Sequence, residues 1–173
     1  MRDALLHFSE DPSIEVFRPH RAAKARVDGE RVWAIDAEHA PSYWFPRQCP
    51  RACCWPGVRP AGAAAAALLG LGGARRLHAI ENGWLERMRA CRLYVYRFDP
   101  APFVQEPESG GAWCARETVR PLGVEPVGDL LERHAQAEIE LRIVPNLWPL
   151  IDAIVDSGLS FSVIRKANAK PRR

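Results

Sequence analysis

The sequence predicts an α+β fold built from mixed, mainly antiparallel sheets with flanking helices. Segments of strand character outnumber helical segments over the first two-thirds of the chain, the helical segments gather towards its end, and no regular alternation of strand and helix is present. The 173 residues are enough to bury a core without metals or disulfides. We expect one globular domain over residues 1–165 and a frayed basic tail over 166–173, which has no apolar anchor.

The first third of the chain is expected to form two strands and one short helix. The expected elements are a strand over 4–8, a strand over 32–35 and a helix over 40–45. Pro12 cannot continue a strand ladder, so the first strand stops before it and His7 lies near the strand end, where a cleft can open. Asp36 is placed to cap the short helix.

The middle of the chain alternates short apolar segments with turn signals. The expected elements are a buried strand over 51–55, one or two helical turns within the alanine-rich run 60–76, a strand over 77–80, a short helix around 84–88 and a strand over 93–98. The last strand carries apolar groups on both faces, which predicts a central place in a sheet. Gly70, Gly72 and Gly73 end the alanine helix and lack the Lys-Ser or Lys-Thr of a phosphate-binding loop.

The last third begins with a surface loop over 102–113 and contains more helix. The expected elements are a brief strand over 112–116, an amphipathic helix around 127–134, a strand over 138–144 and a helix over 146–158. The strand 138–144 alternates apolar and charged residues, which predicts one solvated face. Asn146 can cap the final helix and Gly158 can end it.

Composition and charge exclude several functional classes. The net charge of +3 comes from arginines scattered among acidic residues, which does not favour nucleic-acid binding. Five cysteines leave one unpaired in any complete disulfide scheme, and the N-terminus has no apolar signal segment, so we expect free thiols in a reducing cytoplasm. No apolar run approaches the roughly 20 residues that span a bilayer, so we expect a soluble protein without a membrane partner.

His7 is the first candidate site residue. A neutral imidazole at a strand end can donate a hydrogen bond to a ribose hydroxyl or act as a base, although a structural histidine fits the same pattern. Tyr43 and Trp44 could stack on a flat ring such as nicotinamide, although aromatic residues on a helix face often belong to the core. These three residues therefore indicate a binding site only if they lie together.

Glu117 is the candidate acidic residue. It follows the expected strand 112–116 beside the surface loop, where a carboxylate could hold a ribose hydroxyl or stabilise positive charge developing on a sugar. The alternative is a surface glutamate near Arg116 and Arg120. Glu106 and Glu108, in the preceding loop, are substitutes of lower rank.

The cysteines do not predict a metal site. Cys49, Cys53 and Cys54 could be combined with His39 or His78, but they lack the paired spacing of structural zinc sites, and adjacent residues of a strand point to opposite faces. We therefore expect no bound metal. Cys91 or Cys114 could also meet a histidine in space and act as a nucleophile, but sequence spacing cannot test this.

Several strings in the chain resemble those of an uncharacterised bacterial family, a domain of unknown function. They are HFSEDPSIEVF, VWAIDAEHAPSYWFPRQCPR, GWLERMRACRLYVYRFDP and RETVRPLGVEPVGDLL. This resemblance extends over nearly the whole chain and implies no activity.

The opening string LLHFS is also similar to the first strand of the ADP-ribosyltransferase-like fold, which has the form Leu-Tyr-His-x-Ser/Thr. This second resemblance implies that His7 and Ser9 contact the ribose of NAD and that Tyr43, with Trp44 beside it, stacks on nicotinamide. Glu117 would direct catalysis, although the family's glutamate precedes or opens its strand, whereas Glu117 follows the strand here.

Two functional hypotheses follow. In the first, His7, Tyr43 and an acidic residue line a cleft that binds NAD or a related nucleotide and transfers ADP-ribose or a related group. In the second, the same fold is a binding or interaction module without catalysis, and its aromatic residues form a pocket or an oligomer surface.

Overall fold

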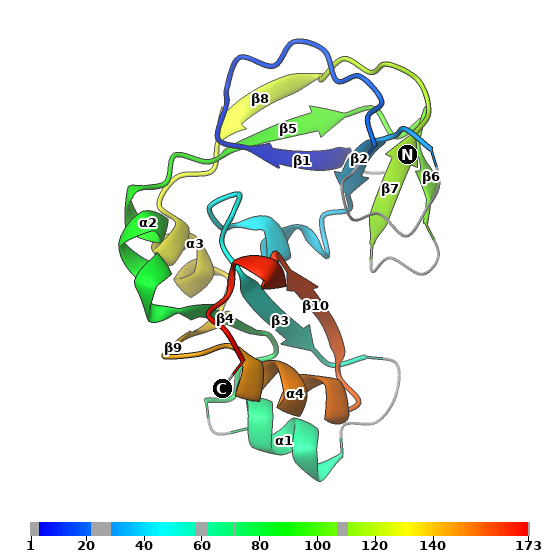
Figure 1. Cartoon of the computed structure of the whole chain (residues 1–173). Coiled ribbons are helices and arrows are strands. Elements are labelled where there is room, and N and C mark those ends of the chain that lie inside the picture. The colour runs from blue at the N-terminus through cyan, green and yellow to red at the C-terminus, as the bar shows by residue number, and fades with distance from the viewer. Residues whose placement is uncertain (1–3, 22–28, 58–61, 71, 107–110, 173) are drawn as a thin grey trace. The chain divides into compact units, whose positions relative to one another are not determined.

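The chain folds into two compact units, shown in Figure 1 by a computed structural model that describes residues 4–21, 29–57, 62–70, 72–106 and 111–172. Unit 1 contains residues 1–44 and 92–128, and unit 2 contains residues 45–91 and 129–173. The described residues form four α-helices and two mainly antiparallel sheets, so the predicted α+β class is confirmed. The sequence predicts one domain over 1–165, whereas each unit buries an apolar cluster of its own.

Unit 1 is built around a six-stranded sheet in which all neighbouring strands are antiparallel. In spatial order its strands are β6 (Val104–Gln105), β7 (Ala112–Ala115), β2 (Val32–Ile35), β1 (Leu5–Ser9), β5 (Tyr94–Phe98) and β8 (Gly123–Pro126). The short 3₁₀ helix η1 (Ala40–Tyr43) follows β2. The strand predicted to be central is β5, which lies between β1 and β8 as expected. The strands β6 and β8 were not expected, because each consists of only a few residues beside proline or glycine.

An aromatic core covers one face of the unit 1 sheet. Phe17 packs edge to face against Tyr96 and Phe98, with ring centroids 5.1 and 4.9 Å apart. Tyr96 is fully buried, and its hydroxyl donates to the carbonyl of Asp11 and accepts from the amide of Ile14. A buried phenol needs such partners, so these bonds fasten the segment that follows β1 over the sheet.

Unit 2 contains a four-stranded sheet and the four α-helices of the described chain. The spatial order of its strands is β10 (Ser160–Ile164), β3 (Arg51–Trp55), β4 (Leu77–Glu81) and β9 (Glu140–Val144), of which only β4 and β9 are parallel. The helices are α1 (Ala63–Leu69), α2 (Leu85–Ala90), α3 (Leu130–Gln136) and α4 (Trp148–Asp156), and the 3₁₀ helices are η2 (Asn82–Trp84) and η3 (Lys166–Asn168). The strand β10 was not expected from the sequence.

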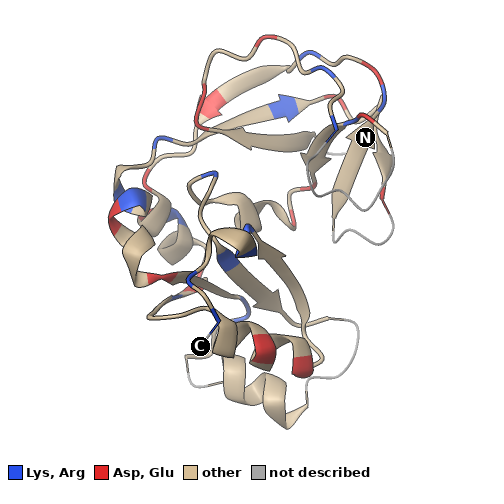
Figure 2. Ribbon diagram, in the orientation of Figure 1, with Lys and Arg blue, Asp and Glu red and all other residues tan. Residues whose placement is uncertain are grey.

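Helices α1 and α4 cover one face of the unit 2 sheet. An apolar cluster joins them to β3 and β4; its buried members are Ala52, Cys54, Ala65, Leu68, Leu69, Leu77, Ala79, Leu147, Ile151, Ile154 and Leu159. All five residues of β4 are buried, because the strand is central and both of its faces are covered. Figure 2 shows basic and acidic residues interspersed along both units, in agreement with the scattered charge of the sequence.

The charged face of β9, which the alternating sequence predicts to be solvated, carries an ion pair that also contacts a helix end. Arg142 donates to Glu140 at 2.7 Å and to the carbonyl of Leu68, near the end of α1, at 2.5 Å. On the opposite face, Ile143 is 39% exposed. The charged face of β9 is therefore only partly solvated, because Arg142 donates to a carbonyl at a helix end, where no donor within the helix is available.

The C-terminal segment makes specific contacts within unit 2, whereas the sequence predicts a frayed tail over 166–173. The buried carboxylate of Glu81 accepts from the backbone amide of Lys170 at 3.0 Å and from that of Leu147 at 3.2 Å. Trp148 donates its indole N–H to the carbonyl of Lys170, and Arg172 lies over the Trp148 ring. These contacts are polar and cation–π contacts, so a search for apolar anchors does not reveal them.

Two histidines form a hydrogen-bonded pair in the core of unit 2. His134, predicted to lie on the core face of its helix, is buried as expected, and its Nδ1 lies 2.7 Å from the carbonyl oxygen of Leu130. Because a carbonyl only accepts, Nδ1 of His134 carries the proton and Nε2 accepts from Nδ1–H of His78 at 3.0 Å. Nε2 of His78 is buried and makes no hydrogen bond with the described residues.

Burial lowers the pKa of both imidazoles. For His78 the pKa falls well below 6.5, and the neighbouring His134, Arg76 and Arg51 lower it further, while a hydrogen bond to Leu130 partly opposes the effect for His134. Both histidines are therefore neutral in the folded protein at neutral pH. Below about pH 6.5 the unfolded chain takes up protons that the folded chain does not, so stability falls as the pH falls towards the lowered values.

We predict that unit 2 loses up to about 1.4 kcal/mol of unfolding free energy per pH unit for each buried histidine as the pH falls below 6.5. Hydrogen exchange of the β4 amides across a pH series, corrected for intrinsic exchange, measures this loss. The variant His134→Leu should have a shallower slope, and His20→Asn, at an exposed position, should keep the wild-type slope. If the unfolding free energy depended on pH equally in all three proteins, the assignment of His134 as a neutral buried histidine that lowers stability at acid pH would be contradicted.

Candidate functional site

The structure places His7 on the core face of the unit 1 sheet. Its ring lies edge to face against Phe17, with centroids 4.9 Å apart, and 6.4 Å from the ring of Phe98. Its Nδ1 lies 2.9 Å from the carbonyl oxygen of Trp33, so Nδ1–H is the donor. His7 thus connects β1 to β2 beneath an aromatic cluster.

Tyr43 lies on the other face of the same sheet. Its ring stacks on that of Phe8, with an interplanar angle of 10° and centroids 6.3 Å apart. Since neighbouring residues of a strand point to opposite faces, Phe8 and His7 lie on opposite sides of β1. The structure therefore does not bring His7 and Tyr43 together.

The remaining predicted cofactor contacts take part in local turns. Ser9 is buried, and its hydroxyl accepts from the amide of Asp11, which closes the turn after β1. The amide of Trp44 donates to the carbonyl of Pro41 at the end of η1. Neither residue is among those that line the pocket described next.

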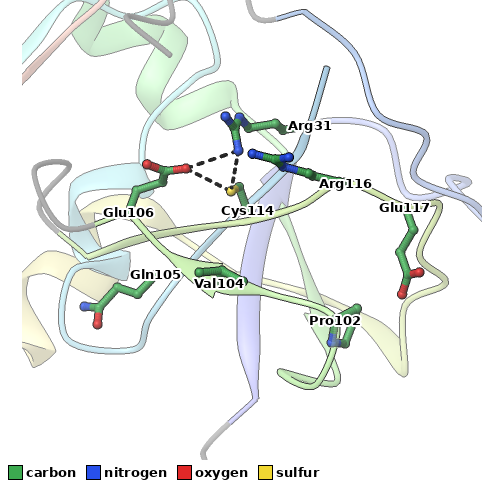
Figure 3. Close-up of a pocket in the computed structure, with 8 residues that line it drawn as sticks. All are labelled: Arg31, Pro102, Val104, Gln105, Glu106, Cys114, Arg116 and Glu117. Carbon is green, nitrogen blue, oxygen red and sulfur yellow. Dashed lines mark hydrogen bonds and ion pairs between the residues drawn. The ribbon is translucent and has the colours of Figure 1, made fainter. Parts of the chain in front are cut away.

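Glu117 lines an open pocket of about 800 Å³ in unit 1. The pocket lies at the edge of the sheet formed by β2, β7 and β6, and Figure 3 shows its lining residues: Arg31, Pro102, Val104, Gln105, Glu106, Cys114, Arg116 and Glu117. His7 is not one of them. Of the two substitutes proposed for Glu117, Glu106 also lines the pocket, while Glu108 lies outside the described residues.

Three of these side chains contact one another in a polar cluster, which we call the Arg31 cluster: Arg31, Glu106 and Cys114. The thiol of Cys114 donates to Oε1 of Glu106 at 3.1 Å, and Nη1 of Arg31 lies 3.4 Å from both that oxygen and the sulfur, as Figure 3 shows. Arg31 is 7% exposed, so its charge is buried in the pocket lining and is balanced by Glu106. No sequence pattern marks Arg31 as part of this site, and Cys114 lies beside Glu106 and Arg31.

Cys114 is held as a protonated thiol. Burial raises its pKa, the hydrogen bond to Glu106 raises it further, and Arg31 opposes these effects in part. A thiol is a weak nucleophile compared with a thiolate. The cluster therefore supplies a hydrogen-bonding surface and a neutralised charge, not an activated nucleophile.

The outer part of the pocket carries charges that the protein does not pair. Arg116 and Glu117 are both exposed and directly follow β7, and neither has a hydrogen bond or ion pair within the described part of the chain. In Figure 3 the guanidinium group of Arg116 extends towards the Arg31 cluster, whereas Glu117 extends away from it. Val104, which is 70% exposed, and Pro102 add an apolar wall.

A second polar arrangement fixes the turn after β2. Oδ1 of Asp36 accepts from the backbone amide of His39 at 2.9 Å and from Nδ1 of its ring at 2.7 Å. The N-cap of η1 is His39, not Asp36 as the sequence predicts, so Asp36 fixes the turn before the helix and not the helix start itself. Gly111 packs against this pair at φ 85°, and a Cβ atom there would lie 2.2 Å from Nδ1 of His39. Only glycine fits this position.

Three cysteines of unit 2, Cys49, Cys53 and Cys54, are buried thiols, and Cys91 is partly exposed. Burial raises the pKa of Cys49 to about 12 and that of Cys54 to about 11. Cys53 and Cys54 are adjacent on β3 and so point to opposite faces. Among the residues that the structure describes, no three histidine, cysteine or acidic side chains are placed to share a metal ion, and no helix has both the length and the apolar character to cross a membrane.

We predict that the variant Glu106→Gln makes Cys114 more reactive towards iodoacetamide. Removing the carboxylate removes a group that disfavours the thiolate and leaves Arg31 to stabilise it, so the alkylation rate should rise about tenfold for each unit by which the pKa falls. Peptide mass spectrometry over time measures this rate for Cys114 separately. The control is Glu125→Gln. Glu125 lies on β8, forms an ion pair with Arg97 of β5 and does not line the pocket. An unchanged rate in Glu106→Gln would contradict the role given to the carboxylate.

Comparison with known proteins places the chain in a family but gives no activity. No curated protein and no solved structure has a significant match to it. The similarity to the ADP-ribosyltransferase-like fold and the bacterial assignment therefore find no support in these comparisons. A family model matches residues 6–169, in agreement with the resemblance seen in the sequence strings. The chain belongs to the family of unknown function DUF6886.

Proposed function

We propose that unit 1 binds a small molecule with an anionic group, of the size of a nucleotide, in the pocket beside the Arg31 cluster. The observation that supports this most directly is the position of Arg116: an exposed guanidinium lines an open pocket and has no ion pair with the described residues. A guanidinium group binds phosphate and carboxylate through paired N–H donors. The pocket volume of about 800 Å³ lies within the range of small-molecule sites.

The Arg31 cluster supports binding more than turnover. Its carboxylate is already engaged by the thiol of Cys114 and by Arg31. Cys114 is held protonated, and His7 lies elsewhere in unit 1. The apolar wall of Val104 and Pro102 offers a surface for the uncharged part of a ligand. A binding module is therefore the hypothesis that the geometry favours, and the five free cysteines support a cytoplasmic location.

A titration with pyrophosphate, ADP and NAD tests the proposal. We predict that Arg116→Gln weakens binding about tenfold or more, since a hydrogen-bonded charge pair contributes roughly 1.5–3 kcal/mol. Arg120→Gln removes an exposed arginine outside the pocket lining and should bind as the wild type does. Isothermal titration calorimetry gives the dissociation constants. If none of the three ligands binds at millimolar concentration, or if Arg116→Gln binds them as tightly as the wild type, the proposal fails.

ADP-ribosyl transfer from NAD is a second candidate, and the place of Glu117 in the pocket wall favours it. A carboxylate beside the bound nucleotide could stabilise positive charge on the ribose as nicotinamide leaves. For this function we predict that the wild type releases nicotinamide from NAD and that Glu117→Gln abolishes the release while still binding NAD. Chromatography of the reaction mixture measures the release. Release that persists in Glu117→Gln would remove Glu117 from catalysis.

A further inference from the structure

We infer that the pocket of unit 1 has a second subsite, for a cationic group, at Glu117, so that its ligands carry an anion and a cation on one small molecule. This inference rests on the proposed anion site at Arg116 and specifies the ligand class for it. The observation behind it is that two opposite charges line one pocket and are paired neither with each other nor with other described residues.

Arg116 and Glu117 are adjacent in the chain, yet their side chains form no ion pair with each other. Adjacent Cα atoms lie only about 3.8 Å apart, so Arg116 and Glu117 could approach each other if their side chains turned to the same side. Figure 3 shows that they diverge instead, with Arg116 extending towards the Arg31 cluster and Glu117 away from it. The free energy lost by keeping them apart is small, because an exposed ion pair contributes only about 0–1 kcal/mol.

Charge balance in the pocket leads to the same ligand class. Glu106 is paired with Arg31 in the Arg31 cluster, so among the described lining residues the charged groups without an ion pair are Arg116, which is positive, and Glu117, which is negative. A ligand with a single anionic group satisfies Arg116 but places its negative charge in the same pocket as Glu117. A ligand that adds an ammonium or other cationic group satisfies both residues and removes this repulsion.

Three small probes separate the two charges: O-phosphoethanolamine carries both, ethyl phosphate carries the anion, and ethanolamine carries the cation. At low ionic strength, where screening is weak, we expect the wild type to bind O-phosphoethanolamine roughly threefold or more tightly than ethyl phosphate, the gain of one exposed charge pair. Glu117→Gln should remove this preference and bind ethyl phosphate at least as tightly as the wild type does. Amide chemical-shift titrations measure these weak affinities.

The control is Glu15→Gln, because Glu15 is an exposed carboxylate of unit 1 outside the pocket lining; it should keep the wild-type preference. If ethyl phosphate binds but the ammonium group adds nothing in the wild type, or if Glu117→Gln keeps the preference, the cation subsite is excluded while the anion site stands. If neither phosphate binds, the proposed anion site fails as well.

Discussion

The alternation of side chains along β1 is the constraint on which the functional interpretation of unit 1 depends. A strand sends successive residues to opposite faces, so the sheet itself separates His7, packed on Phe17, from Phe8, stacked on Tyr43. A site that needs His7 and Tyr43 on one ligand would require a different register for β1. That register is fixed by five consecutive pairings with β5, from Leu5 opposite Phe98 to Ser9 opposite Tyr94, and a shift by one residue would expose the aromatic core. The pocket wall at β2, β7 and β6 is therefore the better place for a ligand.

The electrostatics of that pocket follow from how deeply each charge is buried. Arg31 is almost inaccessible, and an isolated buried guanidinium would be costly, so it is found beside Glu106 and the Cys114 sulfur. Arg116 and Glu117 follow β7 at the surface, where water solvates them and no such pairing is needed. A ligand that enters the pocket displaces this water, and its own charges must replace the lost solvation. The Arg31 cluster thus forms the buried part of the pocket lining, and under the proposed function the exposed pair selects the ligand.

Local sequence patterns predicted the elements better than the site. Turn residues and apolar runs located β1, β2, β3, β4 and β5 and all four helices, since proline, glycine and side-chain periodicity act over a few residues. The strand β6 has only two residues, and β8 begins at a glycine and ends at a proline, so neither gives a strand signal. The Arg31 cluster was out of reach for another reason: Arg31 and Cys114 are 83 positions apart, and they meet only because β2 pairs with β7. Glu117 was selected from its place after a strand beside a loop, and this position does line the pocket; its neighbours there are arginines, not His7.

Unit 2 shows why residue type alone does not locate a site. It holds two buried histidines, a buried acid and three fully buried cysteines, a set that resembles a catalytic centre in the sequence. Glu81 is engaged by backbone amides of Leu147 and Lys170, and His134 accepts from His78 and donates to Leu130. These groups hold strands, helices and the C-terminal segment together, and the thiols are kept protonated by burial. In unit 1, by contrast, Arg116 and Glu117 keep their charges directed to solvent at a pocket. A ligand site is therefore to be sought where polar side chains lack partners in the protein. By this criterion the sheet edge formed by β2, β7 and β6 in unit 1 is a stronger candidate than the buried polar groups of unit 2.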